Sequence, residues 1–343
     1  MRAVQHAEHG GIDVLELVEL PDPAPGADEV VVAVRSAALN RLDLLQREGP
    51  PLLPGFRLPH VPGMDVAGEL AAVGRSVRGL VEGDRVLVKP GVHCGTCAAC
   101  RHGDDRRCTG IRVIGGSLPG GYAERCLVPA THAFAIPDGV HFDDAATVPT
   151  AFSTAWRAMV DTAAVRQGET VVVHGPGSGV TIAAVQLAKQ AGARVIVTGR
   201  SEAKLRRALE VGADHVVLDG DVPMEEVVRD LTGGRGADVV FDHVGPASFG
   251  ASVRMLGLDG RLAHCGTTTG SRVEINLPYL YRMGIRILGV GPQSHRSFVA
   301  MLEHYWSGSY DAVVDSRYPL EKAADAQARL DAGDVFGKVL LQP

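Results

Sequence analysis

The sequence predicts an α/β protein that combines a β-rich region with a doubly wound parallel sheet. Residues 1 to 135 contain short β-prone runs broken by loops, whereas strand-like and helix-like segments alternate from Ala151 onward. The chain has 343 residues, of which 45% are hydrophobic and 22% are charged. Because a domain usually takes roughly 100–200 residues, this length is enough for two domains with separate cores.

In the β-rich region the candidate strands are short, and several alternate polar with apolar residues. This period of two is typical of an antiparallel sheet with one buried face. Loops rich in proline and glycine at 21–26 and 50–54 interrupt the pattern. The candidate strands are residues 14–20, 29–35, 66–73 and 84–89.

The second region contains six short runs rich in Val, Ile and Leu, separated by segments of helical periodicity. Such continuous apolar strands are typical of a parallel sheet covered on both faces, in which each crossover needs a helix-length connection. We therefore expect one dinucleotide-binding sheet. The candidate strands are residues 170–173, 194–198, 215–218, 238–241, 261–265 and 286–290, and the candidate helices are 182–191, 202–211, 224–231 and 248–256.

The C-terminal segment is too short for a third domain with its own core. It carries a candidate helix at 298–305, a strand at 312–314, a helix at 320–330 and a strand at 338–341. We expect it to return to the first domain. The predicted boundaries are 1–151 for the first domain, 152–290 for the parallel-sheet domain and 291–343 for the returning segment.

The charge balance argues against two classes of partner. The formal net charge is -6, so no basic field attracts the chain to nucleic acid or to an anionic membrane. No stretch approaches the roughly 20 apolar residues that cross a bilayer, and the first residues have no apolar signal core. We expect a cytoplasmic protein that takes a small-molecule substrate.

Four of the six cysteines are close in sequence, at Cys94, Cys97, Cys100 and Cys108. Four thiolates can surround Zn²⁺ as a tetrahedron and leave no position open for a substrate. We interpret the segment at about 91–111 as a lobe with one structural zinc ion. The alternative is four reduced thiols, for which this polar loop offers little apolar cover. His60 and His93 are predicted to be surface loop histidines.

A glycine-rich turn follows the first strand of the parallel sheet. Gly175, Gly177 and Gly179 precede a helix, where glycine allows close approach to a pyrophosphate. At the end of the next strand, where NAD sites normally carry an acidic residue, the chain has Gly199 and Arg200. We predict NADP(H) rather than NAD(H), with Arg200 on the 2′-phosphate. The alternative is that Arg200 and Lys204 are solvated residues at a helix start.

These features together resemble the medium-chain dehydrogenase/reductase superfamily over essentially the whole chain. The likeness rests on the turn at 81–86 (VEGDRV), the cysteine lobe, residues 152–156 (FSTAW) and residues 336–339 (FGKV). It implies a GroES-like catalytic domain interrupted by a Rossmann domain, with the substrate cleft between them. It also implies a homodimer or dimer-based oligomer that continues the two cofactor sheets.

The zinc-type alcohol dehydrogenases of this superfamily hold a second, catalytic zinc. The matching positions here are Asn40, Met64, Asp65 and Thr150, which are poor zinc ligands as a set. The resemblance therefore implies that the catalytic zinc is absent. Asn40 matches the quinone oxidoreductase branch, although that branch typically lacks the cysteine lobe, and Thr181 replaces the last glycine of the turn.

Hydride transfer without zinc suits acceptors that delocalise charge, namely enones, enoyl groups and quinones. Asn40 is the candidate donor to the developing oxyanion, and Thr150 and Thr154 are expected at the nicotinamide end. Asn40 has a second interpretation as a helix cap, and Asp65 is expected to be a paired structural carboxylate. Two other functions stay open: a zinc-type alcohol dehydrogenase in which Asp65 helps to recruit a metal, and a non-catalytic NADP(H)-binding sensor or scaffold.

The remaining candidate cofactor contacts lie in the glycine turn and at the carboxyl ends of parallel strands, where such sheets bind ligands. Lys338 is added because it matches a family lysine near the cofactor. The full set is Thr154, Gly175, Gly177, Ser178, Gly179, Val180, Gly199, Arg200, Lys204, His243, Val244, Gly266, Thr267 and Lys338.

Overall fold

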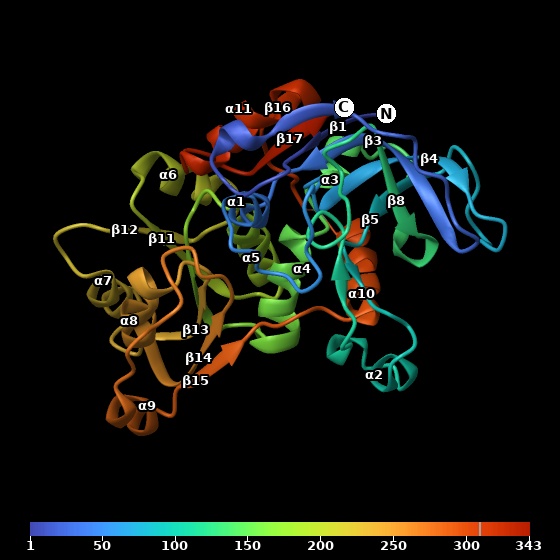
Figure 1. Cartoon of the computed structure of the whole chain (residues 1–343). Helices are drawn as coiled ribbons and strands as arrows, with labels where there is room; N and C mark the ends of the chain where they lie inside the picture. Colours follow the sequence, from blue (N-terminus) through green and yellow to red (C-terminus); the bar gives the residue numbers. More distant parts are fainter. Residues whose placement is uncertain (309) are drawn as a thin grey trace. The chain divides into compact units, whose positions relative to one another are not determined.

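The computed structural model describes residues 1–308 and 310–343 (Figure 1). Its contacts divide the chain into two compact units. Unit 1 contains Met1–Thr150, Ser294–Gly308 and Ala312–Pro343. Unit 2 contains Ala151–Gln293 with Tyr310 and Asp311, so it is inserted into unit 1 along the sequence.

The main sheet of unit 1 has the strand order β16-β17-β3-β4-β5-β9, and β8 also pairs with β3. Strands β16 and β17 are parallel, whereas the pairs formed by β3, β4, β5, β8 and β9 are antiparallel. The strands are β3 (Glu29–Ala38), β4 (Asp65–Val73), β5 (Arg85–Val88), β8 (Arg125–Pro129), β9 (Ala133–Ala135), β16 (Val314–Pro319) and β17 (Lys338–Gln342).

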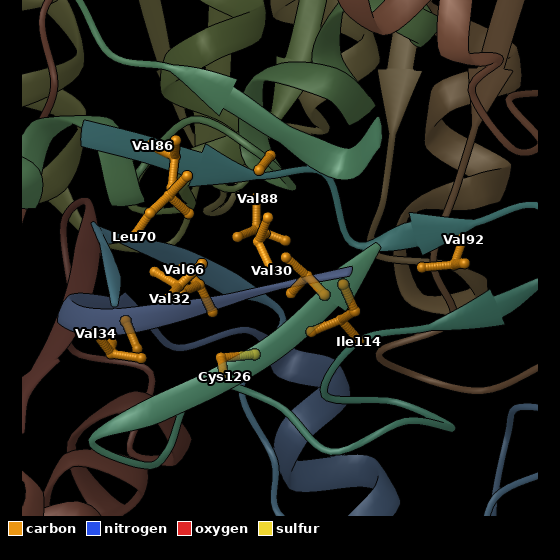
Figure 2. Close-up of a cluster of buried hydrophobic side chains, with 13 residues drawn as sticks. Val30, Val32, Val34, Val66, Leu70, Val86, Val88, Val92, Ile114 and Cys126 are labelled. Carbon is orange, nitrogen blue, oxygen red and sulfur yellow. The ribbon is translucent and has the colours of Figure 1, made fainter. Parts of the chain in front are cut away.

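The central strand of this sheet is covered on both faces, which differs from the half-buried strand that the sequence predicts. Neighbouring residues of a strand point to opposite faces, and Val31 and Val32 of β3 are both fully buried. Figure 2 shows one of the covered faces, where apolar side chains of β3, β4, β5 and β8 meet in a core. A strand between two layers needs apolar residues on both sides, and β3 supplies them.

Unit 1 also contains two small antiparallel strand pairs and several short helices. The antiparallel pairs are β1 (Arg2–Gln5) with β2 (Glu16–Glu19), and β6 (Gly91–Val92) with β7 (Arg112–Val113). The helices are α1 (Arg41–Glu48), α2 (Ala98–Arg101), α3 (Phe142–Ala146), α10 (His295–Ser307) and α11 (Ala323–Asp331), with 3-10 turns η1 (Ile12–Val14), η2 (Asp105–Arg107), η3 (Ala130–His132) and η5 (Leu320–Lys322).

Unit 2 has a parallel sheet in the order β12-β11-β10-β13-β14-β15. The chain order reverses between β10 and β13, which is the switch point where doubly wound sheets bind ligands. The strands are β10 (Thr170–His174), β11 (Arg194–Gly199), β12 (His215–Leu218), β13 (Ala237–Asp242), β14 (Leu256–His264) and β15 (Arg286–Gly289). The helical segments are α4 (Ala151–Trp156), η4 (Arg157–Thr162), α5 (Gly179–Gln190), α6 (Glu202–Glu210), α7 (Met224–Leu231), α8 (Pro246–Met255) and α9 (Leu277–Met283).

Several elements differ from the sequence-based expectation, and three of them show why. Strand β14 begins at Leu256 rather than at 261, and its pairing with β13 contains a register shift. Strand β16 lies at Val314–Pro319 rather than 312–314, where it pairs with β17. Helix α9 has no prediction, because its Leu277 and Tyr281 are exposed and leave no amphipathic pattern.

Among the described residues, none of the helices has the length and hydropathy that a bilayer crossing requires.

Candidate functional site

The four cysteines of the lobe lie within metal-binding reach of one another. The sulfur atoms of Cys94, Cys97, Cys100 and Cys108 are all within 4.8 Å of one another. The distance from Cys94 Sγ to Cys100 Sγ is 4.0 Å. Tetrahedral zinc with Zn–S bonds of about 2.3 Å holds its sulfur atoms about 3.8 Å apart. The cluster therefore fits a structural zinc site, as the sequence predicts.

Backbone N–H groups face two of these sulfur atoms. The N–H of Cys97 donates to Cys94 Sγ at 3.4 Å, and the N–H of Cys94 donates to Cys108 Sγ at 3.3 Å. Hydrogen bonds to the Cys94 sulfur, chiefly from the backbone N–H of Cys97, lower the pKa of Cys94 to about 6. Because the thiolate is the form that binds zinc, the loop conformation favours the ligand state of this cysteine.

The prediction that His60 and His93 are surface histidines is wrong. His60 is 5% exposed, and its Nε2 lies 3.1 Å from the carbonyl oxygen of Gly115. The ring of His93 is 7% exposed and lies 3.4 Å from the carboxylate of Asp105. Polar groups can be buried when they find hydrogen-bonding partners. The Gly115 carbonyl is such a partner for His60, and the Lys89 ammonium, 3.4 Å from Nδ1, is one for His93. Loop composition alone did not indicate these partners.

Asp65 is fully buried at the start of β4, and its carboxylate accepts four hydrogen bonds. Oδ1 accepts from the backbone N–H of Thr150 at 2.9 Å and from its hydroxyl at 2.6 Å. Oδ2 accepts from the Asn40 amide and from the Lys338 ammonium, each at 3.0 Å. Thus both candidate catalytic residues and Lys338 meet at one carboxylate in unit 1.

The donors of this cluster are engaged with groups of the chain itself. Lys338, which is 6% exposed, also donates to the carbonyl of Leu39 at 2.7 Å and to Asn40 Oδ1 at 2.8 Å. An ammonium has three N–H donors, so all three are used. Asn40 Nδ2 also donates to the carbonyl of Ala38 at 3.2 Å. That Asn40 or Lys338 contacts a ligand stays a prediction. Such a contact requires that one of these hydrogen bonds be replaced by a bond to the ligand.

Asn40 is also the N-cap residue of α1, the position that its second interpretation assigns to it. Its backbone N–H donates to the carboxylate of Asp43 at 2.8 Å. The hydroxyl of Tyr122 donates to the same carboxylate at 3.2 Å. Burial of Asp43 raises its pKa to about 7. This carboxyl group therefore titrates near neutral pH beside the Asp65 cluster.

In unit 2 the glycine-rich turn joins β10 to α5. Gly175 has a φ of +74°, and a Cβ there would lie 3.2 Å from the ring of His243, so conformation and space both favour glycine. Gly177 is buried in the turn. Ser178 is the N-cap of α5 and accepts from the N–H of Val180 at 3.2 Å, and Gly179 is the first residue of the helix. The strand, turn and helix thus follow in the order that pyrophosphate binding requires.

Thr181 ties this turn to the loop after β13. Its hydroxyl donates to the carbonyl of His174 at 2.7 Å, and His243 Nε2 lies 2.8 Å from the same hydroxyl oxygen. His243 Nε2 also lies 3.0 Å from that carbonyl. Because a carbonyl only accepts, Nε2 of His243 carries hydrogen. The residue that replaces the last glycine of the turn therefore helps to hold a candidate cofactor contact.

The end of β11 has no room for a side chain. A Cβ at Gly199 would lie 2.4 Å from the ring of Pro176. Arg200 is exposed, and the next residue, Ser201, is the N-cap of α6 and accepts from the N–H of Lys204 at 3.5 Å. An exposed guanidinium thus lies where the strand ends and the helix begins.

The other candidate cofactor contacts of unit 2 have these positions. Val244 follows β13, and Gly266 and Thr267 follow β14. Gly266 has a φ of +83°, and a Cβ there would lie 2.9 Å from the carbonyl of His243. Thr154 lies in α4. Because the sheet is parallel, the residues after β10, β11, β13 and β14 lie along the edge that is formed by the carboxyl ends of its strands.

Sequence reasoning missed a set of buried polar residues at this edge. His174, Thr198 and Asp242 stand at or next to the ends of apolar strands, and each comes directly before a candidate cofactor contact. The available signal was a polar residue that closes an apolar run just before a loop. Their contacts are described below.

Two family models match the chain. The model of the alcohol dehydrogenase GroES-like domain matches residues 26–138, and the model of the zinc-binding dehydrogenase matches residues 179–307. The first lies in unit 1, and most of the second lies in unit 2.

Known proteins are similar along nearly the whole chain. An acryloyl-coenzyme A reductase of Sulfurisphaera tokodaii is 30% identical over 96% of each chain. The quinone oxidoreductase of Homo sapiens is 28% identical over 99% of this chain and 97% of that protein. A crystal structure of an NAD-dependent alcohol dehydrogenase is 39% identical, with a TM-score of 0.94 and full coverage of both chains. The cysteine cluster, the strand order of unit 2 and these matches show that the chain belongs to the medium-chain dehydrogenase/reductase superfamily, as an oxidoreductase.

Proposed function

We propose that this enzyme transfers hydride from NADPH to a conjugated carbonyl compound or a quinone without a catalytic zinc ion. Two relatives support the substrate class. One is named for reduction of an acryloyl thioester, in which a double bond is conjugated with a carbonyl, and one is named for quinones. In both acceptors the charge that hydride brings is delocalised onto oxygen.

The observation that carries the proposal is the closed network around Asp65. The family's zinc-ligand positions hold Asn40, Met64, Asp65 and Thr150. In the structure the carboxylate already accepts four hydrogen bonds, one of them from the Lys338 ammonium at 3.0 Å. Zinc would have to compete with that cation for one carboxylate, aided only by an amide, a thioether and a hydroxyl. These residues do not fit a zinc ion.

The chain's own groups then have two tasks. The bound nicotinamide supplies the hydride. The glycine turn and the N-terminus of α5 hold the pyrophosphate, because backbone N–H groups there lack helical partners. Near the acceptor, the Asn40 amide donates to the oxygen on which negative charge develops. To do so it gives up its 3.2 Å bond to the Ala38 carbonyl, the longest bond that its side chain makes in the cluster.

The preference for NADPH rests on the end of β11. An acidic side chain that would bind the adenosine ribose in an NAD site does not fit at Gly199, because the Pro176 ring fills that space. The exposed Arg200 offers a charge for the 2′-phosphate. The remaining parts of the proposal are a homodimer or dimer-based oligomer that continues the two cofactor sheets, and cofactor contacts as predicted from the sequence.

The test is NADPH consumption against a panel of enones, enoyl thioesters, quinones and simple aldehydes, with both cofactors titrated by calorimetry. We expect turnover with conjugated acceptors and tighter binding of NADPH than of NADH. Tighter NADH binding would refute the cofactor assignment, and turnover confined to simple aldehydes and alcohols would refute the substrate class.

A second candidate function is a zinc-type alcohol dehydrogenase. It is favoured by the structural relative of that name at 39% identity. Two zinc ions per chain and alcohol oxidation that chelators abolish would support it. Cofactor binding with no turnover on the whole panel would instead indicate a non-catalytic sensor or scaffold.

A further inference from the structure

Four buried polar side chains form a continuous hydrogen-bonded relay in unit 2. His174 Nδ1 lies 2.5 Å from Thr198 Oγ1, and His174 Nε2 lies 2.8 Å from Ser252 Oγ. Ser252 Oγ in turn lies 2.6 Å from Asp242 Oδ2. The four residues are at most 3% exposed. The relay joins the ends of β10, β11 and β13 to α8.

The direction of the relay follows from its chemistry. A carboxylate only accepts, so the Ser252 hydroxyl donates to Asp242, and Ser252 Oγ then accepts from His174 Nε2. Nδ1 accepts from the Thr198 hydroxyl. This arrangement needs a neutral imidazole, and burial lowers the pKa of His174 to about 4. Every link has one donor and one acceptor.

Asp242 is a buried carboxylate held by uncharged donors. Ser248 donates to Oδ2 at 2.7 Å, and the backbone N–H groups of Val244 and Gly245 donate to Oδ1 at 2.8 and 3.1 Å. A buried carboxylate is costly unless it is hydrogen-bonded. Its partners include the backbone of the loop after β13, so the carboxylate fixes the conformation of that loop.

The relay residues alternate with the candidate cofactor contacts. His174 immediately precedes Gly175, and Thr198 immediately precedes Gly199 and Arg200. Asp242 immediately precedes His243 and Val244. On three strands, therefore, a buried polar side chain at or next to the carboxyl end belongs to one network, and the chain then enters a loop at the ligand-binding edge.

We propose that His174, Thr198, Ser252 and Asp242 are positioning residues for the dinucleotide. They touch one another and hold in register the three loops expected to contact the cofactor, so this inference rests on the proposed cofactor site. Removing one link loosens the relative placement of the glycine turn and the Arg200 loop. Cofactor affinity is then reduced, whereas the reaction of the bound cofactor is nearly unchanged.

The test makes the isosteric change of Thr to Val at two positions near opposite ends of the strands of the parallel sheet. Thr198→Val removes one relay hydroxyl, and Thr198→Ser restores it. Thr232→Val is the control, because buried Thr232 binds the carbonyl of Val228 and the N–H of Gly236 just before β13 begins, away from the ligand edge. Each variant is measured for its NADPH dissociation constant, for KM and kcat with the acceptor, and for its thermal midpoint.

We expect Thr198→Val to weaken NADPH binding about tenfold with kcat changed less than about threefold, and Thr198→Ser to bind like wild type. Thr232→Val should lower the thermal midpoint without changing NADPH affinity. The relay proposal is overturned if wild type binds NADPH and Thr198→Val binds it equally well. If wild type binds neither NADPH nor NADH, the proposed function itself is refuted, and the relay proposal falls with it.

Discussion

The cysteine lobe and the Asp65 cluster match the two zinc positions of the superfamily, yet their negative charges are balanced in different ways. In the lobe, four sulfur atoms of one kind approach within 4.8 Å and leave their negative charge for a metal ion to neutralise. At Asp65, one carboxylate is already neutralised by an ammonium and saturated by an amide and a threonine. The cysteine sulfur atoms therefore lack a neutralising partner from the chain, whereas the chain's own groups already complete the bonding of Asp65.

The largest expected effect comes from breaking the lobe. Cys97→Ser removes one of the four sulfur atoms of the cluster that fits a structural zinc ion, and such ions contribute directly to folding. We expect zinc content to fall well below one ion per chain, and the lobe to become sensitive to limited proteolysis. Zinc analysis and peptide mapping measure both effects. Cys265→Ser, outside the lobe, should keep its zinc, and full zinc retention by Cys97→Ser would contradict the assignment.

The second effect comes from breaking the ion pair of the Asp65 cluster. Asp65→Leu leaves the Lys338 ammonium buried without its carboxylate, which should cost about 3–5 kcal/mol in the free energy of unfolding. The double variant Asp65→Leu/Lys338→Met removes both charges and should recover a large part of that loss. Denaturant unfolding gives both values.

A matched control for this pair lies on the surface of the same sheet. Glu69→Ala breaks the exposed pair of Arg35 and Glu69, which joins β3 and β4, and should cost less than about 1 kcal/mol. If Asp65→Leu cost no more than this control, the network would not be the closed, buried unit described above.

The third effect distinguishes the Asp65 cluster from the cysteine lobe by the pH dependence of the free energy of unfolding. The pKa of Asp43 is raised to about 7, above its unfolded value of 3.8, mainly by burial. Between these pH values the folded state holds a proton that the unfolded state has lost. The contribution of Asp43 protonation to the free energy of unfolding is therefore complete below pH 3.8, and it disappears as pH rises through 7. It amounts to up to about 4 kcal/mol at 1.36 kcal/mol per pH unit.

We expect the unfolding free energy of wild type to fall between pH 5 and pH 8 while zinc content stays constant. Asp43→Asn should flatten this slope, because the amide does not ionise. Equal slopes in wild type and variant, measured by urea unfolding, would remove Asp43 as the source. A loss of zinc over the same range would assign the effect to the lobe.

The smallest effect lies outside both regions. Arg200→Ala should weaken NADPH binding about tenfold, the loss of one charge-assisted contact, and leave NADH binding unchanged. Arg206→Ala, which breaks an exposed pair with Glu202 on the same helix, is the control. Equal effects of Arg200→Ala on both cofactors would show that the residue does not recognise the 2′-phosphate.

How far the sequence could predict this molecule depended on whether the signal was local. The strands of unit 2 are continuous apolar runs, and the four cysteines lie within one short segment. Both the strands and the candidate zinc ligands could therefore be predicted from local sequence. Lys338 and Asp65 are 273 residues apart, and their ion pair is made by the antiparallel pairing of β3 with both β4 and β17. No local pattern encodes that meeting.

The same reason explains the errors. His60 is buried because its ring reaches a carbonyl at Gly115, far along the chain. His174 and Thr198 are each a single polar residue at the end of an apolar run, which gave no sign of the bond between them or of the bond from His174 to Ser252 in α8. The structural role of a buried polar residue depends on hydrogen-bonding partners that come together only in the folded protein.

The most direct test of the account counts zinc and follows hydride transfer in one preparation. We predict about one zinc ion per chain, together with NADPH-dependent reduction of a conjugated acceptor at a rate that added Zn²⁺ does not change. Two zinc ions per chain, with a rate that rises and falls with the second ion, would contradict the central claim.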